Sequence, residues 1–417
     1  MKYFENLIAL LAHFAQAFIN FVERLLISNN NKEFEKSACV RRVLFRFKTG
    51  VNYEFSSKYD FISIHESFQH PRHVLEECFS LYCLTEDEAV FVNCGDMDIF
   101  DSKYAFAYDT QFNNACQVIT LPMSSFLLIS KQIAMPDAPV LHLANHGRCG
   151  STLLTKLFEA IPDALSISEV NGFTDLAEMS LKKGVEDYNR LKQICQSVVL
   201  FTLKHAVARK SSFVLIKCQS SAVFITDMII STVPSIKQVY MYRQPVQFVQ
   251  SYEKLMAVNK WDPPSDQICC YWGGIGHHKI LPNACQQLPE AKVKTLSTFA
   301  RWAIIWITGT AVYDQLIRSG VDMKSLKYEH LLENPMETLT ALFHYVGIPL
   351  SLMPSMDEVF AKDSQVGTPF SSRGGSKDLL KQALTPITDQ LKVEINGICD
   401  EFSVPYFWDD VTLQNKL

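Results

Sequence analysis

The segment VLHLANHGRCGSTLLTKLFEAI, residues 140–161, decides the fold of this chain. It begins with a continuous apolar run typical of a buried strand, and it ends with apolar residues at helical spacing that stop before Pro162. The loop between them has glycines at Gly147 and Gly150, followed by the hydroxyl side chains of Ser151 and Thr152. A strand, a glycine-containing loop and a helix in this order direct backbone N–H groups and a positive helix end at an anion. The segment therefore predicts a phosphate-binding loop.

This loop differs from the pattern G-x-x-x-x-G-K-[ST] of nucleoside triphosphatases. The dipeptide Gly-Lys occurs nowhere in the chain, so the lysine that reaches the terminal phosphates in those enzymes is absent from the loop. The sequence indicates a phosphate-like ligand other than ATP with magnesium.

Strand-like and helix-like segments alternate after Pro139, which is typical of a parallel α/β sheet. The runs FVLIK (213–217) and SIKQVYMY (235–242) predict strands covered on both faces. A long helix is expected from about Val293 to Arg318, and another strand and helix follow within residues 325–350. In that last helix Asn334 suits the N-cap, Pro335 the first position and Gly347 the end. We therefore expect a three-layer α/β core with a parallel sheet and a P-loop-like nucleotide site over residues 136–417.

Residues 38–135 form a β-rich extension that precedes this core. Short apolar runs are separated there by polar residues, glycine, asparagine and aspartate, as between strands. The runs are VLFRF, FISIH, AVFVN, YAFAY, QVITL and FLLIS. The stretch holds no motif that indicates chemistry, so we interpret it as an accessory region.

Residues 1–37 are expected to form an amphipathic helix followed by a polar linker. Asn6, His13 and Asn20 recur every seven residues, with Gln16 and Glu23 close to the same stripe. Apolar side chains occupy the opposite side of the helix. The uncharged stretch from Asn6 to Val22 is near the lower length limit for crossing a bilayer. The pattern favours a helix that docks on the protein or contacts a membrane surface, with a membrane anchor as the alternative.

The composition is that of an ordinary globular protein, with 48% hydrophobic and 20% charged residues in 417. A net charge of −5 argues against a general nucleic-acid binder, because such a protein needs a basic surface for the phosphates. The twelve cysteines include no C-x-x-C pair, so they do not form a disulfide or metal framework. Reduced thiols favour a cytoplasmic location, and a Golgi membrane location would follow if the N-terminal helix were an anchor.

A second anion-binding candidate lies in VYMYRQPVQFVQSYEKL, residues 239–255. Arg243 follows a predicted strand, and Ser251 comes eight residues later on the helix that Pro245 can begin. The carboxyl end of a strand is where open α/β sheets bind ligands, and a guanidinium group suits a phosphate. Taken alone, an arginine and a helix serine are common surface residues.

The two segments, followed by L-K-Y-E-H-L-L-E-N-P at residues 326–335, together resemble the sulfotransferase family. These enzymes use 3′-phosphoadenosine 5′-phosphosulfate (PAPS) as the sulfuryl donor. The resemblance covers about residues 139–350 and includes some local similarity to tyrosylprotein sulfotransferases. It implies a transferase that moves a sulfuryl group from PAPS to an acceptor hydroxyl or amine without a required metal.

The resemblance also implies roles for individual residues. The loop would hold the 5′-phosphosulfate, and Arg148 would stabilise charge on the bridging oxygen and the leaving phosphate. Arg243 and Ser251 would bind the 3′-phosphate, Tyr328 would lie near the adenine, and Arg373 would add a contact to the 3′-phosphate. The loop residues concerned are Gly147, Arg148, Cys149, Gly150, Ser151 and Thr152.

Two candidates remain for the group that accepts the proton of the acceptor. Glu169, in LSISEVNG, matches the glutamate that tyrosylprotein sulfotransferases use, and a buried carboxylate could act as a base. An exposed loop glutamate is the alternative interpretation. Cytosolic sulfotransferases use a histidine in K-x-H, but this chain has Lys217-Cys218-Gln219 there. Lys217 either lines the site or is a plain lysine at the end of a strand.

Two other functions stay open at this stage. An unusual P-loop kinase or NTPase would bind ATP with magnesium, and an inactive scaffold would bind the nucleotide without transfer. The acceptor cannot be derived from the sequence, and peptide tyrosine, carbohydrate and small alcohol are all compatible with it.

Overall fold

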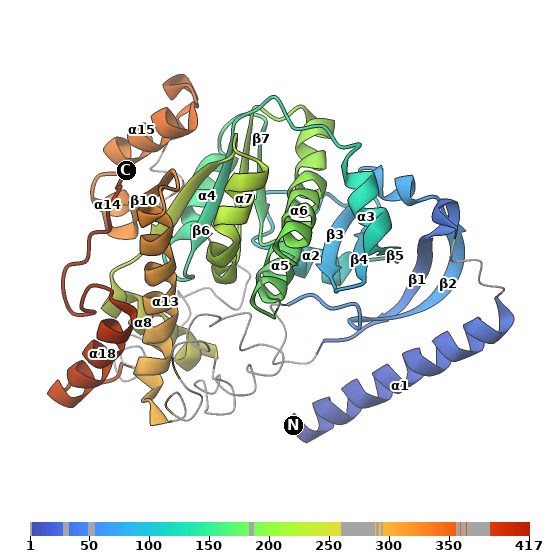
Figure 1. The fold of residues 1–417 in the computed structure, drawn as a ribbon, viewed down its shortest axis with the longest axis horizontal. Coiled ribbons are helices and arrows are strands. Elements are labelled where there is room, and N and C mark those ends of the chain that lie inside the picture. The colour runs from blue at the N-terminus through green and yellow to red at the C-terminus, as the bar shows by residue number, and fades with distance from the viewer. Residues whose placement is uncertain are drawn as a thin grey trace. The chain divides into compact units, whose positions relative to one another are not determined.

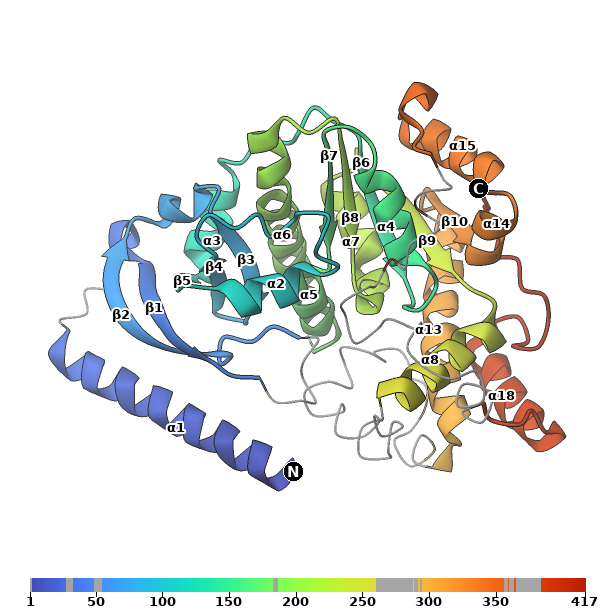
Figure 2. The same cartoon turned by 180° about the vertical axis from the view of Figure 1, so that it is seen from behind.

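The structure is a computed structural model and describes residues 2–27, 33–48, 55–182, 187–259, 288, 292, 295–355, 359, 364 and 384–417. The chain divides into two compact units. The first comprises residues 1–137, 167–179 and 187–211, and the second comprises residues 138–166, 180–186 and 212–417. Each unit has its own sheet and helices, and Figures 1 and 2 show them from opposite sides.

The second unit is built on a five-stranded sheet with strand order β10-β9-β6-β8-β7. Its strands are β6 (Val140–Asn145), β7 (Ala164–Ser168), β8 (Phe213–Lys217), β9 (Lys237–Tyr242) and β10 (Met323–Lys327). The central strand β6 pairs in parallel with β8 and β9, and β9 pairs in parallel with β10. From β6 the chain first forms β7 and β8 on one side of this strand. It then forms β9 and β10 on the other side. Open α/β sheets bind ligands at the carboxyl ends of the strands beside such a switch point.

Helices cover both faces of this sheet. The helices of the unit are α4 (Ser151–Glu159), α7 (Thr226–Thr232), α8 (Pro245–Asn259), α13 (Thr298–Arg318), α14 (Tyr328–Glu333), α15 (Pro335–Val346) and α18 (Asp389–Phe402). On one face Leu141 and Leu143 pack with buried residues of α4 and α15. On the other face Ala144 and Tyr240 pack with residues of α13 and α18. The predicted three-layer α/β fold with a parallel sheet is therefore confirmed.

The termini of the helices follow the sequence signals in part, and Asn334 lies at the N-cap position of α15 without a side-chain capping bond. Pro335 is the first residue of α15, and Gly347 ends it with a left-handed φ of 87°. The predicted long helix begins at Thr298, because the Ser297 hydroxyl accepts the Ala300 N–H at 3.2 Å and forms the N-cap.

The first unit contains an antiparallel sheet with strand order β2-β1-β5-β4-β3. Its strands are β1 (Ala38–Arg46), β2 (Phe61–Gln69), β3 (Phe79–Leu84), β4 (Glu88–Asn93) and β5 (Gln117–Pro122). Its helices are α1 (Lys2–Leu26), α2 (Ala107–Asn114), α3 (Met123–Ser130), α5 (Asn171–Lys182) and α6 (Tyr188–Arg209). The predicted β-rich extension is thus present as a separate antiparallel sheet.

Two of the six predicted strands in this region are wrong. FLLIS lies in α3, where Met123, Phe126 and Ile129 are buried at a spacing of three residues. YAFAY leads into α2, which begins at Ala107. A short apolar run has no distinct period, so its contacts decide between strand and helix. In α3 the Phe126 ring stacks on Phe201 of α6 with ring centres 5.0 Å apart.

Candidate functional site

The conformation of the loop after β6 is fixed by its own backbone and by Asn145, the last residue of that strand. The Asn145 side chain accepts the Gly147 N–H at 2.8 Å and donates to the Cys218 carbonyl after β8 at 2.7 Å. Gly147, Arg148 and Gly150 all have left-handed backbone, with φ of 79°, 48° and 84°. This conformation costs a non-glycine residue energy, and such strain is typical of functional loops.

The two glycines are required for different reasons. A Cβ on Gly150 would lie 2.3 Å from the Tyr328 ring, so the ring contacts the loop backbone directly. A Cβ on Gly147 would lie 2.7 Å from the Tyr252 hydroxyl. Tyr252 is itself fixed by Trp302, since the two rings stack with centres 4.2 Å apart. The loop therefore has tyrosine side chains from α8 and α14 against its backbone.

The remaining loop residues are buried at the start of α4. Burial raises the pKa of the Cys149 thiol to about 11, so this side chain is a neutral thiol at physiological pH. The hydroxyl of Thr152 accepts a hydrogen bond from the Lys217 ammonium group at 3.2 Å. Lys217 is 2% exposed, so a positive charge lies beneath the start of the helix.

His146 connects the phosphate-binding loop to the end of β9. Its Nε2 accepts the Arg243 N–H at 3.1 Å, so the proton is on Nδ1, which donates to the Gly147 carbonyl at 2.9 Å. Burial lowers the pKa of His146 to about 4, with a smaller contribution from the Arg243 charge. The imidazole is neutral at physiological pH and holds the two loops together by both nitrogens.

Acid is expected to destabilise the chain between about pH 6.5 and pH 4. Burial lowers the pKa of His146 and of His142 to about 4, whereas the unfolded chain protonates them near 6.5. The unfolded state therefore binds more protons in this range, and the free energy of unfolding falls as the pH falls, by up to ~1.4 kcal/mol per pH unit for each histidine. Urea unfolding across this range measures the slope. His146→Asn should be less stable at pH 7 and show a shallower slope, and an unchanged slope would contradict the assignment.

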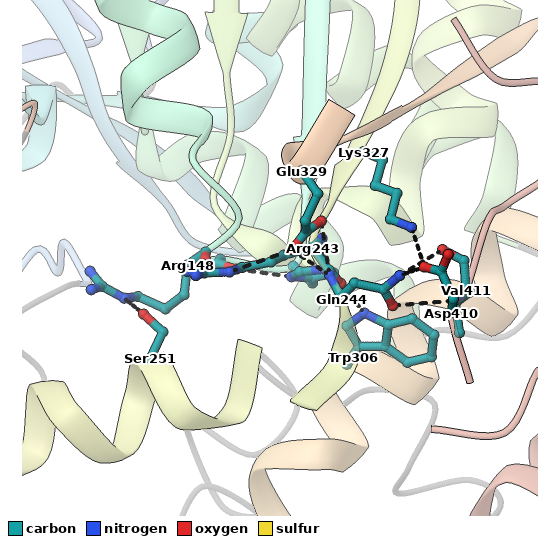
Figure 3. Close-up of polar contacts among 11 residues, drawn as sticks. Arg148, Arg243, Gln244, Ser251, Trp306, Lys327, Glu329, Asp410 and Val411 are labelled. Atoms are coloured by element: carbon teal, nitrogen blue, oxygen red, sulfur yellow. Dashed lines mark hydrogen bonds and ion pairs between the residues drawn. The ribbon is translucent and has the colours of Figure 1, made fainter. Parts of the chain in front are cut away.

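Arg148 and Arg243 lie close together at the carboxyl ends of β6 and β9 (Figure 3). The Arg148 Nε donates to the Ser251 hydroxyl on α8 at 3.0 Å. The Arg243 Nη1 reaches the Arg148 carbonyl at 3.5 Å, and its guanidinium lies over the Tyr328 ring, 4.8 Å from the ring centre. The structure thus brings four predicted site residues together, with Ser251 bonded to Arg148.

Sequence reasoning did not assign Glu329, Gln244 or Asp410, which form the other side of Arg243 (Figure 3). Glu329 forms an ion pair with Arg243 at 3.8 Å and accepts the Gln244 N–H at 3.2 and 3.3 Å. The Gln244 amide donates to Asp410, and the buried Lys327 ammonium pairs with the same carboxylate at 2.6 Å. Glu329 follows Tyr328 directly and could have been found from that motif, but nothing local points to Asp410.

The last two predicted site residues are Glu169 and Arg373. Glu169 follows β7 directly, is half-buried and has a left-handed φ of 60°. It belongs to the first unit. Arg373 lies outside the described residues.

A hollow of about 350 Å³ is present elsewhere in the second unit, between α13 and α18. Its lining includes Arg318 and Asp314, which pair with each other at 3.6 Å. It contains none of the loop residues, so we do not assign the anion site to it.

Comparison with known proteins gives a likeness of structure. No family model and no curated protein matches the chain. The sulfotransferase domain from the curacin biosynthetic pathway is 15% identical, with a TM-score of 0.37, over 65% of this chain and 99% of that one. A sulfotransferase from Alicyclobacillus acidocaldarius is 11% identical, with a TM-score of 0.35, over 66% and 98%. A mouse sulfotransferase complexed with PAP is 11% identical, with a TM-score of 0.32, over 66% and 87%.

These structures are all sulfotransferases, which is the family that the sequence motifs resemble. Because their identities and TM-scores are low, the function must be argued from the residues of the site.

Proposed function

We propose that the second unit binds PAPS and transfers its sulfuryl group to an acceptor hydroxyl or amine. The observation that carries the proposal is the position of Arg243, whose guanidinium lies within 3.5 Å of the Arg148 carbonyl in the glycine loop. Two strand ends, far apart in sequence, thereby present positive charge beside one helix N-terminus. A nucleotide with phosphate groups on both sides of its ribose is the ligand class that such a pair of sites suits.

The phosphosulfate end would bind at the loop. The first N–H groups of α4 have no partner within the helix and favour negative charge. The Arg148 guanidinium, which donates to the Ser251 hydroxyl, would offset charge on the leaving phosphate. Sulfuryl transfer depends mainly on positioning and on stabilising charge, which this set of groups can supply.

The 3′-phosphate would bind at Arg243. Its side chain is 26% exposed and forms an ion pair with Glu329. The Tyr328 ring lies against Gly150 and under the Arg243 guanidinium, beside both proposed phosphate sites. Tyr328 therefore suits the proposed place near the adenine.

Proton transfer from the acceptor to Glu169 stays a prediction that rests on the motif similarity described above. Its half-burial and left-handed backbone are the features expected of a functional loop carboxylate. Loss of transfer with retained donor binding in Glu169→Gln would support the role. Wild-type transfer in that variant would remove it.

Replacing Arg243 by alanine is expected to weaken the binding of adenosine 3′,5′-bisphosphate by roughly 10- to 100-fold, since a charge-assisted contact to phosphate contributes about 1.5–3 kcal/mol. Titration calorimetry with adenosine 3′,5′-bisphosphate, ADP and ATP with magnesium measures this. The affinity for ADP, which lacks the 3′-phosphate, should change less.

The matched control is Arg318→Ala, because Arg318 is an exposed arginine on α13 with a carboxylate partner of its own. It should leave all three affinities unchanged. Equal affinity of wild type and Arg243→Ala for the bisphosphate would contradict the proposal. Tighter binding of ATP with magnesium than of the bisphosphate would favour a kinase or NTPase instead.

A further inference from the structure

Helix α1 packs on the first unit through its polar side chains. The Gln16 amide donates to the Ser63 carbonyl at 3.1 Å and accepts the Ser63 N–H at 2.7 Å. Glu23 accepts the His65 N–H at 2.7 Å and pairs with Arg41 at 2.8 Å. The side chains of Glu23 and Arg41 are only 18% and 15% exposed. The polar stripe of the helix is thus its protein-binding face.

This packing covers an edge of the antiparallel sheet. β2 is the outermost strand, and the backbone groups of Ser63 and His65 in it form hydrogen bonds with side chains of α1. Figures 1 and 2 show α1 running along β2. An uncovered edge strand pairs readily with other chains, so the polar stripe has a structural purpose. It also fixes the rotation of the helix about its axis.

The opposite face of α1 is apolar and exposed. Seven large side chains on it are between 52% and 79% exposed, which is the reverse of an ordinary surface helix. They are Leu10, Leu11, Phe14, Phe18, Phe21, Leu25 and Leu26. An aromatic side chain alone buries roughly 150–250 Å² when covered, so together they exceed the apolar patch of most soluble monomers.

The width and charge of this face distinguish between the surfaces that could cover it. At 3.6 residues per turn the seven side chains spread over roughly 160° of the helix circumference. A partner helix covers a narrow a/d stripe, and a protein interface of this area carries polar groups and hydrogen bonds among its apolar ones. At the border Arg24 is exposed, while the neighbouring Glu23 is already paired with Arg41. A wide apolar face bordered by an exposed arginine is complementary to an anionic lipid surface.

We propose that α1 binds a membrane surface, lying in the plane of the lipid interface with its leucine and phenylalanine face inserted. The sheet edge holds the helix from the protein side, so the whole chain is attached without a spanning segment. None of the described helices has the length and apolar character needed to cross a bilayer. The proposal is independent of the sulfotransferase function.

Flotation of the full-length chain with lipid vesicles tests the proposal. The wild type should float with phosphatidylcholine vesicles that contain phosphatidylserine, and Phe14→Gln/Phe18→Gln/Phe21→Gln should lose roughly tenfold or more in affinity. Arg24→Glu should weaken binding to the anionic vesicles by about fivefold or more and leave binding to pure phosphatidylcholine unchanged. Glutamine keeps helix propensity, and circular dichroism verifies the fold of each variant.

The matched control is Val393→Gln, because Val393 is an apolar residue on α18 that is 73% exposed. It should float like the wild type. A wild type that does not float, or a triple variant that floats equally well, would overturn the proposal. Sedimentation velocity without lipid gives the other decisive result, since a dimer that the triple variant abolishes would assign the face to a second copy of the chain.

Discussion

Replacing Gly150 by alanine is expected to lower the free energy of unfolding by roughly 3 kcal/mol or more and to abolish nucleotide binding at the loop. The new Cβ would lie 2.3 and 2.4 Å from two carbons of the Tyr328 ring. The backbone at Gly150 also has a φ of 84°, which alanine adopts at a cost. Relief of the contact requires the ring or the loop to move, and both belong to the candidate site. Urea unfolding and calorimetry with adenosine 3′,5′-bisphosphate measure the two effects.

Gly320 provides the control that separates these causes. It has the same φ of 84°, but a Cβ there would meet nothing within 4 Å. Gly320→Ala should therefore lower the free energy of unfolding by about 1–2 kcal/mol, which is the contribution of the left-handed backbone alone. Adding Tyr328→Ala to Gly150→Ala should relieve the contact with the ring, but the loss caused by the left-handed backbone should remain. Equal losses in Gly150→Ala and Gly320→Ala would show that the ring does not press on the loop.

Replacing Arg148 by alanine is expected to lower the turnover number by roughly 10²–10³, the range found when a group that stabilises transition-state charge is removed. Arg148 already has left-handed backbone at a φ of 48°, so alanine adds no new strain there. The affinity for the bisphosphate should change much less than in Arg243→Ala. Transfer of labelled sulfuryl from PAPS, with an acceptor found in a panel of phenols, sugars and amines, measures the turnover.

Arg148→Lys separates charge from shape in this experiment. A lysine keeps the positive charge but loses the planar fork and the Nε donor that bonds to Ser251. Its turnover should lie between those of the wild type and the alanine variant. If Arg148→Ala turned over like the wild type while Arg243→Ala lost donor affinity, the donor site would stand and the role of Arg148 would be wrong.

The sequence predicted the core well because its strands are buried on both faces. β6, β8 and β9 are continuous apolar or β-branched runs, and helices with clear caps or stops follow them. The loop after β6 could be predicted because its glycines and hydroxyls follow a strand and begin a helix. The parallel sheet then brings strand ends together, which is why Arg148 and Arg243 lie close although 95 residues separate them.

The first unit and the edge of the site were harder to predict for physical reasons. FLLIS has no period that distinguishes a strand from a helix, and β3 lies in a stretch that was not recognised as a strand. Asp410 reaches Gln244 across 166 residues, and no local pattern encodes such a contact. The heptad pattern of α1 gave its polar stripe, but the free edge of β2 decides that this stripe faces the protein.

The bridge made by His146 has a consequence for the kinetics of ligand binding. One neutral ring and the Trp306 indole, which donates to the Arg243 carbonyl at 2.8 Å, hold both strand ends in place. A ligand therefore binds to groups that are already in position, and little conformational entropy is lost in ordering them. Its rate of association should be set by diffusion and ionic strength, and differences in affinity among nucleotides should appear in how slowly each one leaves.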